Sequence, residues 1–164
     1  MNIKANVLKY GDDINTDLII PGKYLVITDE KMLGQYAMNG IDPDFFTKSQ
    51  NGSILVVGEN FGSGSSREQA PISLKNAGVK CVIAKSFARI FYRNAINIGL
   101  PVLECIPIWK EVKDGDILSI ALEEGKIVHQ RSGQTYNSQP LPSFILDIIR
   151  EGGLLNKLKK SINN

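Results

Sequence analysis

The chain has 164 residues, of which 43% are hydrophobic and 22% are charged, as expected for a globular protein with a core of its own. Nineteen Lys and Arg residues against 17 Asp and Glu residues give a net charge of +2, which excludes a polybasic nucleic-acid or membrane-surface binder on charge alone. No apolar run approaches the roughly 18 residues of a membrane span, and the first residues lack the pattern of a signal peptide. We therefore expect a cytoplasmic protein that binds neither nucleic acid nor membranes, with a single domain over residues 1–164.

The first 52 residues combine one predicted strand with a long irregular segment. Apolar and polar residues roughly alternate over residues 3–10, which predicts a strand that ends at the polar turn of residues 11–13. Residues 11–52 then hold several turn signals between short apolar patches. Because long ordered loops usually carry function, we expect this segment to contribute to it.

A regular alternation of strands and helices follows. Three apolar runs of strand length are expected to form buried strands, at residues 53–58, 81–84 and 100–106. Two helical segments separate them: one ends at Ala77, before Gly78, and the other covers residues 87–98, before Gly99. This order predicts right-handed βαβ units with a parallel sheet.

The C-terminal part differs in character. Three short strands, separated by turns that contain glycine, are expected at residues 116–120, 126–129 and 134–136, as a small antiparallel appendage. An amphipathic helix is expected over residues 143–150, and a glycine pair separates it from a basic tail, residues 154–160, that we expect to form a solvated helix. The predicted fold class is therefore α/β, with a central, mostly parallel sheet flanked by helices.

The strongest candidate for a functional site is the segment Gly58-Glu59-Asn60-Phe61-Gly62-Ser63-Gly64-Ser65-Ser66-Arg67-Glu68. It follows a buried strand and precedes a helix, so it lies at the carboxyl end of a strand, where open α/β sheets bind ligands. Gly62 and Gly64 let the backbone approach a ligand and turn its N–H groups toward an anion.

A purely structural interpretation of the same loop is a capping box. Ser65 and Glu68 have the spacing at which a serine and a glutamate satisfy the free N–H groups at a helix start. Pro71 argues for a later start, near Ala70, because proline fits best in the first turn of a helix. A later start would leave residues 65–67 free to face a ligand.

Other catalytic and binding motifs fit poorly. Gly62-Ser63-Gly64 begins like a dinucleotide-binding fingerprint, but Arg67 stands where the third glycine belongs. The loop lacks the Gly-Lys-Ser/Thr of a Walker A loop, and its serines have the wrong spacing for a nucleophile elbow. The only histidine, His129, has no serine or acid patterned around it, so we expect an ordinary strand or surface residue.

The two cysteines, Cys81 and Cys105, lie far apart in apolar stretches, and we expect buried strand thiols. Neither belongs to a CxxC motif, so the cysteines of this chain cannot assemble a metal site or an iron–sulfur cluster.

Three segments together carry a family resemblance: Asp13-Ile14-Asn15-Thr16-Asp17, Gly62-Ser63-Gly64-Ser65-Ser66-Arg67-Glu68 and Lys85-Ser86-Phe87-Ala88-Arg89-Ile90. In order and spacing, over residues 11–101, they resemble the swivelling carboxyl-terminal domain of the aconitase superfamily. As a free-standing short chain, the sequence is similar to the small subunits of 3-isopropylmalate dehydratases. The resemblance implies the β/β/α swivelling fold of aconitase type.

The resemblance also implies roles for the loop residues. Ser65 matches the family's base, which takes a proton from the carbon next to a carboxylate, and Arg67 matches the arginine that holds a substrate carboxylate. A serine alkoxide is unfavourable at neutral pH, so it needs nearby N–H donors and positive charge, which Gly64, Ser66 and Arg67 can supply. Ser66 would add a hydrogen bond to the ligand. Asp17 matches a family active-site aspartate, and its alternative role is simple turn or cap chemistry.

The cofactor and the partner follow from the same resemblance. In the family, a [4Fe–4S] cluster helps the substrate hydroxyl to leave as a Lewis acid. Because the two cysteines here do not suit a cluster, we expect no cofactor or metal on this chain and place the cluster on a partner large subunit. Arg89 and Asn94 match a helix that the family packs beside the site, and we expect structural or interfacial roles for them.

Residues 21–29 resemble the family's specificity loop, in which aconitases and homoaconitases place an arginine for the substrate's γ-carboxylate. Here the loop has Val26 and Ile27. An unpaired carboxylate against two aliphatic side chains would cost several kcal/mol, whereas an isopropyl group would gain about 1.5–3 kcal/mol from burial. A methyl-substituted malate stays open, because a methylene or two is worth only about 1–3 kcal/mol in such a pocket.

The resulting prediction is the small subunit of an iron–sulfur hydro-lyase that isomerises 2-isopropylmalate and 3-isopropylmalate through isopropylmaleate, in leucine biosynthesis. The alternatives are the small subunit of a homoaconitase or of a methylmalate (citramalate) dehydratase, a non-catalytic anion- or nucleotide-binding module, and an assembly or regulatory subunit with a vestigial motif. The intact Ser65, Ser66 and Arg67 argue against the last of these.

Overall fold

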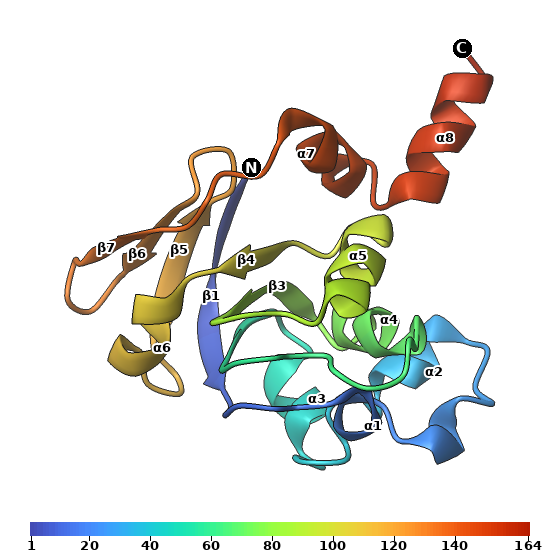
Figure 1. Cartoon of the computed structure of the whole chain (residues 1–164), viewed down its shortest axis with the longest axis horizontal. Coiled ribbons are helices and arrows are strands. Elements are labelled where there is room, and N and C mark those ends of the chain that lie inside the picture. Colours follow the sequence, from blue (N-terminus) through green and yellow to red (C-terminus); the bar gives the residue numbers. More distant parts are fainter.

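The computed structural model describes residues 1–164, and its centre is one seven-stranded sheet (Figure 1). The strand order is β4-β3-β2-β1-β5-β6-β7. The strands are β1 (Asn2–Lys9), β2 (Ser53–Val57), β3 (Val79–Ala84), β4 (Val102–Glu104), β5 (Ile117–Ala121), β6 (Lys126–His129) and β7 (Thr135–Asn137).

The first four strands run parallel. β2, β3 and β4 confirm the predicted βαβ pattern, and β1 extends it by pairing with β2, which the sequence analysis did not predict. β1 pairs with β2, β2 with β3 and β3 with β4, all in parallel. All five residues of β2 are buried, as its continuous apolar run predicts. Because the strands are parallel, the loops that follow β1, β2 and β3 emerge at one edge of the sheet.

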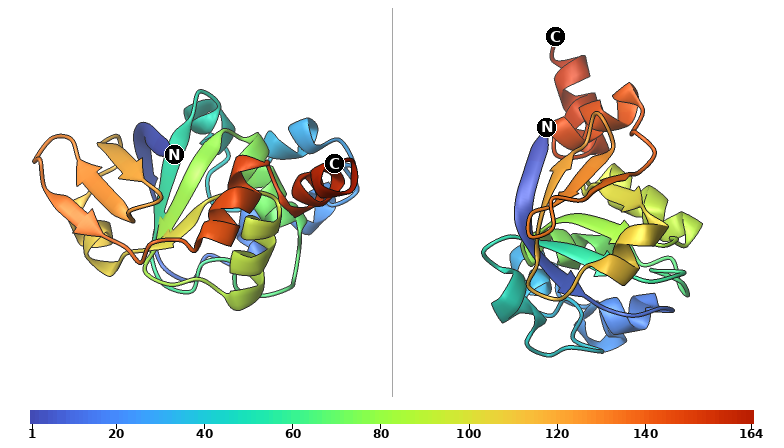
Figure 2. Two further views of the ribbon diagram at one scale, coloured as in Figure 1. Left: turned by 90° about the horizontal axis from the view of Figure 1, so that it is seen from above. Right: turned by 90° about the vertical axis from the view of Figure 1, so that its left-hand side faces the viewer.

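The antiparallel strands extend the same sheet. β5 pairs with β1 on the side opposite β2, with Ile3 beside Ile120, and β6 and β7 follow as antiparallel neighbours. The predicted appendage is therefore continuous with the central sheet through β1. It forms one end of the molecule, and the C-terminal helix forms the other (Figure 2).

Eight helices and one 3₁₀ turn connect or follow the strands. They are α1 (Thr16–Ile19), η1 (Gly22–Tyr24), α2 (Glu30–Gly34), α3 (Phe45–Ser49), α4 (Gln69–Asn76), α5 (Arg89–Asn97), α6 (Ile106–Glu111), α7 (Ser143–Arg150) and α8 (Leu154–Ile162). The longest have nine residues, and none has the length and apolar character that a membrane span requires.

The two crossover helices end as predicted; α4 begins at Gln69, next to the start near Ala70 that Pro71 indicated, whereas α5 begins later than predicted. Gly78 and Gly99 follow the helix ends with φ of 101° and 77°, the left-handed conformation that glycine adopts without strain. α5 begins at Arg89 rather than at Phe87, because the Ala88 N–H donates to the Phe61 carbonyl of the neighbouring loop.

The expected strand over residues 100–106 is shorter than predicted. β4 ends at Glu104, and α6 occupies the following residues with Pro107 in its first turn. Proline has no N–H for a strand ladder but fits the first turn of a helix, which explains the switch.

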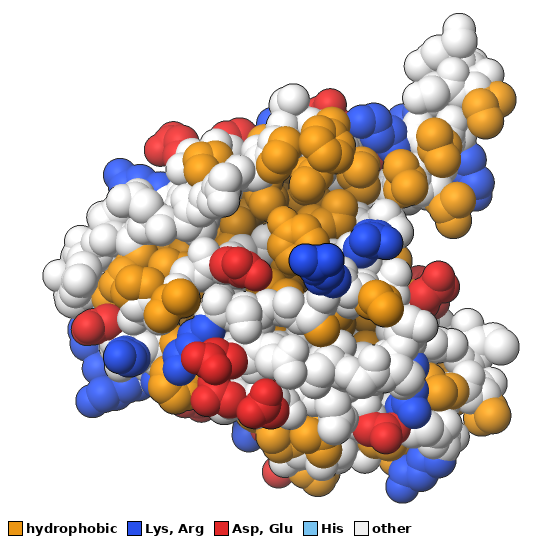
Figure 3. Space-filling view, in the orientation of Figure 1, with side chains coloured by type: hydrophobic (Ala, Val, Ile, Leu, Met, Phe, Trp, Pro, Cys, Tyr) orange, Lys and Arg blue, Asp and Glu red, His pale blue; other side chains and the backbone are white.

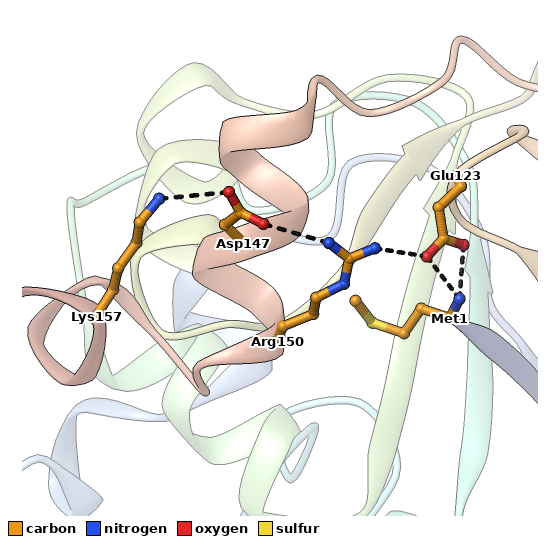
Figure 4. Close-up of polar contacts among 5 residues, drawn as sticks. All are labelled: Met1, Glu123, Asp147, Arg150 and Lys157. Atoms are coloured by element: carbon orange, nitrogen blue, oxygen red, sulfur yellow. Dashed lines mark hydrogen bonds and ion pairs between the residues drawn. The ribbon is translucent and has the colours of Figure 1, made fainter. Parts of the chain in front are cut away.

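The C-terminal helices were placed correctly, and polar contacts tie α7 to the sheet. Glu123, in the β5–β6 turn, accepts from Arg150 of α7 and from the amino group of Met1, and Arg150 also pairs with Asp147 (Figure 4). Lys157 of α8 lies 3.9 Å from Asp147. α8 itself projects from the body without a buried residue, as expected for a solvated helix (Figure 1).

Candidate active site

The first two motifs meet at the carboxyl edge of the parallel strands. The Gly62 N–H donates to the Ile14 carbonyl at 2.9 Å, and the Thr16 N–H donates to the Ser63 carbonyl at 2.8 Å. Asn15 and Ser63 form a parallel bridge at the same point. The loop after β1 and the loop after β2 therefore lie side by side for several residues.

The third motif joins the second loop from the other side. The Phe61 N–H donates to the Ser86 carbonyl at 3.1 Å, and the Phe61 carbonyl accepts from the Ala88 N–H at 2.9 Å. The Asn60 N–H also donates to the Ser86 hydroxyl at 2.8 Å. Segments that are far apart in the sequence thus form one hydrogen-bonded layer, with the serine loop between its two neighbours.

Both glycines of the loop are required by geometry. Gly62 has φ of 82°, and a Cβ there would lie only 2.2 Å from the ring of Phe91. Gly64 has φ of 96° and is exposed, so its backbone is accessible beside the serines. The predicted close approach of the backbone to a ligand fits this arrangement.

The capping-box interpretation is wrong. α4 begins at Gln69, and the preceding Glu68 is itself helical and makes no side-chain capping bond. Ser65 and Ser66 are both exposed. The Ser65 hydroxyl instead lies 3.3 Å from the hydroxyl of Thr16, a residue to which the sequence analysis assigned no role. Pro71, which indicated the later helix start, was the correct signal.

Arg67 is held in place by the first motif. One of its terminal nitrogens, Nη1, pairs with the carboxylate of Asp17 and also donates to the Ile20 carbonyl at 3.0 Å. The other, Nη2, lies 3.9 Å from the position that a Cβ on Gly22 would take. Asp17 itself is exposed and belongs to α1, whose N-terminus is capped by Asn15.

The expected specificity loop begins beside Arg67. Ile20 contacts the guanidinium just before η1, and Gly22, the first residue of η1, lies beside it; Val26 and Ile27 follow η1. Val26 is 83% exposed, whereas Ile27 is half-buried and packs against the core. Of the two aliphatic residues, Val26 is therefore the one that presents its side chain to the outside.

The side chains of Arg89 and Asn94 make no hydrogen bond and no ion pair, so no polar contact links them to the serine loop. Arg89 is exposed and lines a groove of about 1000 Å³ between α5, β4 and α7. Figure 3 shows the apolar side chains that gather on this face of the molecule. Lys85 and Phe87 also line the groove, so it begins next to the third motif.

His129 has partners that the sequence analysis missed. It lies in β6, as expected for a strand residue, but its Nε2 is 2.9 Å from Asp116 Oδ2 and its Nδ1 is 3.0 Å from Ser132 Oγ. Burial by itself would raise the pKa of Asp116, but the Lys113 N–H, the charge of Arg131 and the bond to His129 together hold that pKa below its usual range. This cluster belongs to the antiparallel strands, whereas the motif loops follow the parallel ones.

The chain contains no group of three or more His, Cys, Asp or Glu side chains placed to hold a metal ion. Cys81 and Cys105 are both buried and unpaired, and burial raises the pKa of each thiol. A high pKa disfavours the thiolate that binds iron or zinc. These residues therefore do not fit an iron–sulfur cluster.

Comparison with known proteins gives consistent results. Residues 12–106 match the aconitase C-terminal domain family. The chain is 52% identical to the 3-isopropylmalate dehydratase small subunit of Halothermothrix orenii, over 100% of this chain and 99% of the relative. It is 51% identical to the isopropylmalate/citramalate isomerase small subunit of Methanocaldococcus jannaschii, over 98% and 95% of the two chains.

Two solved structures are also similar. The crystal structure of 3-isopropylmalate dehydratase from Methanocaldococcus jannaschii matches with a TM-score of 0.92 and 49% identity, over 98% of this chain and 95% of the other. Aconitase X from Thermococcus kodakaraensis shares the fold alone, with a TM-score of 0.52 and 18% identity over 84% and 90% of the two chains. The chain therefore belongs to the family of 3-isopropylmalate dehydratase small subunits, with an aconitase-type swivelling fold.

Proposed function

We propose that this chain is the small subunit of a hydro-lyase that isomerises 2-isopropylmalate and 3-isopropylmalate through isopropylmaleate, in cytoplasmic leucine biosynthesis. The observation that carries the proposal is the cluster of Ser65, Arg67 and Asp17 at one edge of the sheet, from two motifs 50 residues apart. The names of relatives that match nearly the whole chain support the same assignment.

The chemistry requires a base and a carboxylate anchor. Arg67 keeps part of its guanidinium free of protein partners, and this part can bind a substrate carboxylate through two parallel hydrogen bonds. Ser65 then takes the proton from the carbon next to that carboxylate, while the hydroxyl leaves the neighbouring carbon to give the alkene. Ser66, which makes no side-chain hydrogen bond within the chain, is free to bind the same ligand. Returning water with the opposite regiochemistry completes the isomerisation.

A partner must supply the rest of the site. Gly64, Ser65 and Ser66 are exposed, so this chain alone does not exclude water from the base. We propose that a large subunit covers this side of the site and excludes water from it, in a heterodimer or a larger assembly. The [4Fe–4S] cluster that the family resemblance implies also belongs there, and it supplies Lewis-acid assistance to the leaving hydroxyl when bound.

The substrate side chain is assigned to the loop that begins beside Arg67. Val26 gives the loop an exposed aliphatic group, which suits an isopropyl substituent and opposes the γ-carboxylate of a homoaconitase substrate. Citramalate, with a methyl group in place of isopropyl, is the second candidate. The relative from Methanocaldococcus jannaschii, which bears both substrates in its name, favours it specifically.

Reconstitution with the native large subunit tests the proposal. The chain would be purified from its native cells together with the large subunit that binds it. Alkene formation would then be measured by absorbance, with 2-isopropylmalate, citramalate or homocitrate-derived acids as substrates. We expect activity with the first, and weaker or equal activity with the second. The isolated chain should be colourless and inactive. A brown, active chain without a partner would contradict the proposal, as would binding of nucleotides without turnover of any malate.

A further inference from the structure

We propose that Thr16 is a positioning residue for Ser65: its hydroxyl fixes the serine oxygen and donates a hydrogen bond to that oxygen once the serine has lost its proton. The inference rests on the proposed role of Ser65 as the base. Thr16 lies in the first turn of α1, 49 residues before Ser65.

The Thr16 hydroxyl contacts Ser65 at two atoms. Its Oγ1 donates to the Ser65 carbonyl at 3.0 Å and lies 3.3 Å from the Ser65 hydroxyl oxygen. A hydroxyl has one proton and two lone pairs, so it cannot donate to both atoms at once. While Thr16 donates to the carbonyl, the donor in the second contact is therefore Ser65, whose proton points toward Thr16.

Deprotonation of Ser65 changes this preference. The alkoxide has no proton to donate, and a charged acceptor forms a stronger hydrogen bond than a carbonyl does. Rotation of the Thr16 hydroxyl then redirects its proton from the carbonyl to the Ser65 oxygen, and no heavy atom has to move. The contact favours the charged form of the serine, which is the form that the proposed reaction needs.

Thr16 is held much more firmly than the serine that it contacts. It is 3% exposed, whereas Ser65 is exposed. Its N–H donates to the Ser63 carbonyl at 2.8 Å, and its own carbonyl accepts from the Ile20 N–H at 2.9 Å. Its β-branched side chain has few χ1 rotamers, and the hydrogen bond from Oγ1 to the Ser65 carbonyl selects one of them. A buried residue thus orients an exposed one.

The surroundings make the contact specific to one serine. Ser66 forms no side-chain hydrogen bond, so only Ser65 of the pair is oriented by another side chain. A Cβ at position 64 would only come into ordinary contact with Thr16 Oγ1, at 3.4 Å, so glycine is required there by its φ of 96° rather than by lack of space. The structure therefore gives a physical difference between the two adjacent serines, to which the family resemblance assigns different roles.

The test compares Thr16→Ser with Thr16→Ala in the holoenzyme, reconstituted with the large subunit. These variants both lose the methyl group and differ only in the hydroxyl. We expect Thr16→Ala to lower kcat by about ten- to hundredfold with KM within about twofold, and Thr16→Ser to recover most of the loss. The rise of kcat with pH should shift to higher pH in Thr16→Ala and stay near wild type in Thr16→Ser. Equal kcat and pH profiles for the two variants would overturn the inference.

Two further variants separate the possible failures. Ser49→Ala removes a buried hydroxyl that lies outside the three motifs and donates to the Ala77 carbonyl at 2.7 Å, and it should leave kcat unchanged. A loss of kcat in Ser49→Ala as large as in Thr16→Ala would mean that the effect is structural and would refute the role of Thr16. Ser65→Ala tests the base itself. If Ser65→Ala stays active, Ser65 is not the base and the proposed function of the serine is wrong. If Ser65→Ala is inactive while Thr16→Ala keeps wild-type kcat, only the positioning role of Thr16 is refuted.

Discussion

The guanidinium of Arg67 and the carboxylate of Asp17 form an ion pair that joins two motifs 50 residues apart. The Arg67 side chain is 20% exposed and that of Asp17 is 67% exposed, so the pair lies at the surface with the arginine as its more protected member. Exposed ion pairs contribute little to stability, typically less than about 1 kcal/mol. The contact matters more for orientation, because it fixes Nη1 of Arg67 and leaves the other guanidinium nitrogens available to bind a substrate carboxylate.

Arg67→Lys should lower kcat/KM by about tenfold or more and raise KM. Lysine keeps the positive charge but cannot hold Asp17 and a substrate carboxylate through a planar fork. Steady-state kinetics of the reconstituted enzyme measure the effect. Arg150→Lys on α7 makes the same substitution in an exposed ion pair outside the three motifs, so it serves as the control and should be neutral for catalysis. Wild-type KM in Arg67→Lys would show that a point charge suffices there.

Ser65→Ala should abolish nearly all turnover while the fold persists. We expect kcat to fall by about 10²–10⁴-fold, the range of a lost general base. The free energy of unfolding should change by no more than about 1.5 kcal/mol, because the hydroxyl is exposed and makes one weak contact. Ser161→Ala on α8 is the matched control, since it removes an exposed hydroxyl that bonds to a carbonyl. A loss of only a few-fold would place the base elsewhere.

Val26→Arg should weaken turnover of isopropylmalate and improve that of acids with a γ-carboxylate. Arginine occupies the volume of the isopropyl group and requires an anion to offset its desolvation. The single change is cleaner than one combined with Ile27→Thr, because Ile27 packs against the core and its loss would also cost stability. The measurement is kcat/KM for both substrates, with Val26→Met as the uncharged control. An unchanged ratio would mean that the loop does not face the substituent.

Gly62→Ala should destabilise the chain by about 2–4 kcal/mol, as measured by urea unfolding. The new Cβ would lie 2.2 Å from the Phe91 ring, and the alanine would also have to keep a φ of 82°, which residues with a Cβ rarely adopt. Gly115→Ala separates the two effects, because Gly115 has φ of 87° with no atom within 4 Å of the added carbon. The control should lose only about 1 kcal/mol. Equal losses in the two variants would mean that Phe91 yields to the methyl group.

Asp116→Asn should destabilise the antiparallel strands in a pH-dependent way. The folded-state pKa of Asp116 is lowered from an ordinary value of 3.8, so its charge stabilises the fold above about pH 4. That contribution is lost as pH falls through the lowered pKa. The difference in unfolding free energy from wild type should therefore be about 1–3 kcal/mol at neutral pH and should shrink below pH 4. A constant difference from pH 7 to pH 2 would rule out the charge as its source.

The sequence by itself determined the parallel half of the sheet and the position of the serine loop. Strands such as β2 are buried on both faces and leave a continuous apolar run, and the helices end at glycines that adopt positive φ. These are local signals. The strand order, which only the structure supplies, then places the loops after β1, β2 and β3 at one edge of the sheet, where the three motifs meet.

Only the tertiary structure decided which side chains touch. The pairs Thr16–Ser65 and Arg67–Asp17 join residues about 50 positions apart, and His129 finds Asp116 across a strand pair. The short helices of residues 11–52 also escaped prediction, because segments of four or five residues carry no helical periodicity and are stable only through packing. Hydrogen bonds between loops depend on where the fold places the two backbones in space. Composition and spacing along the chain do not specify that placement.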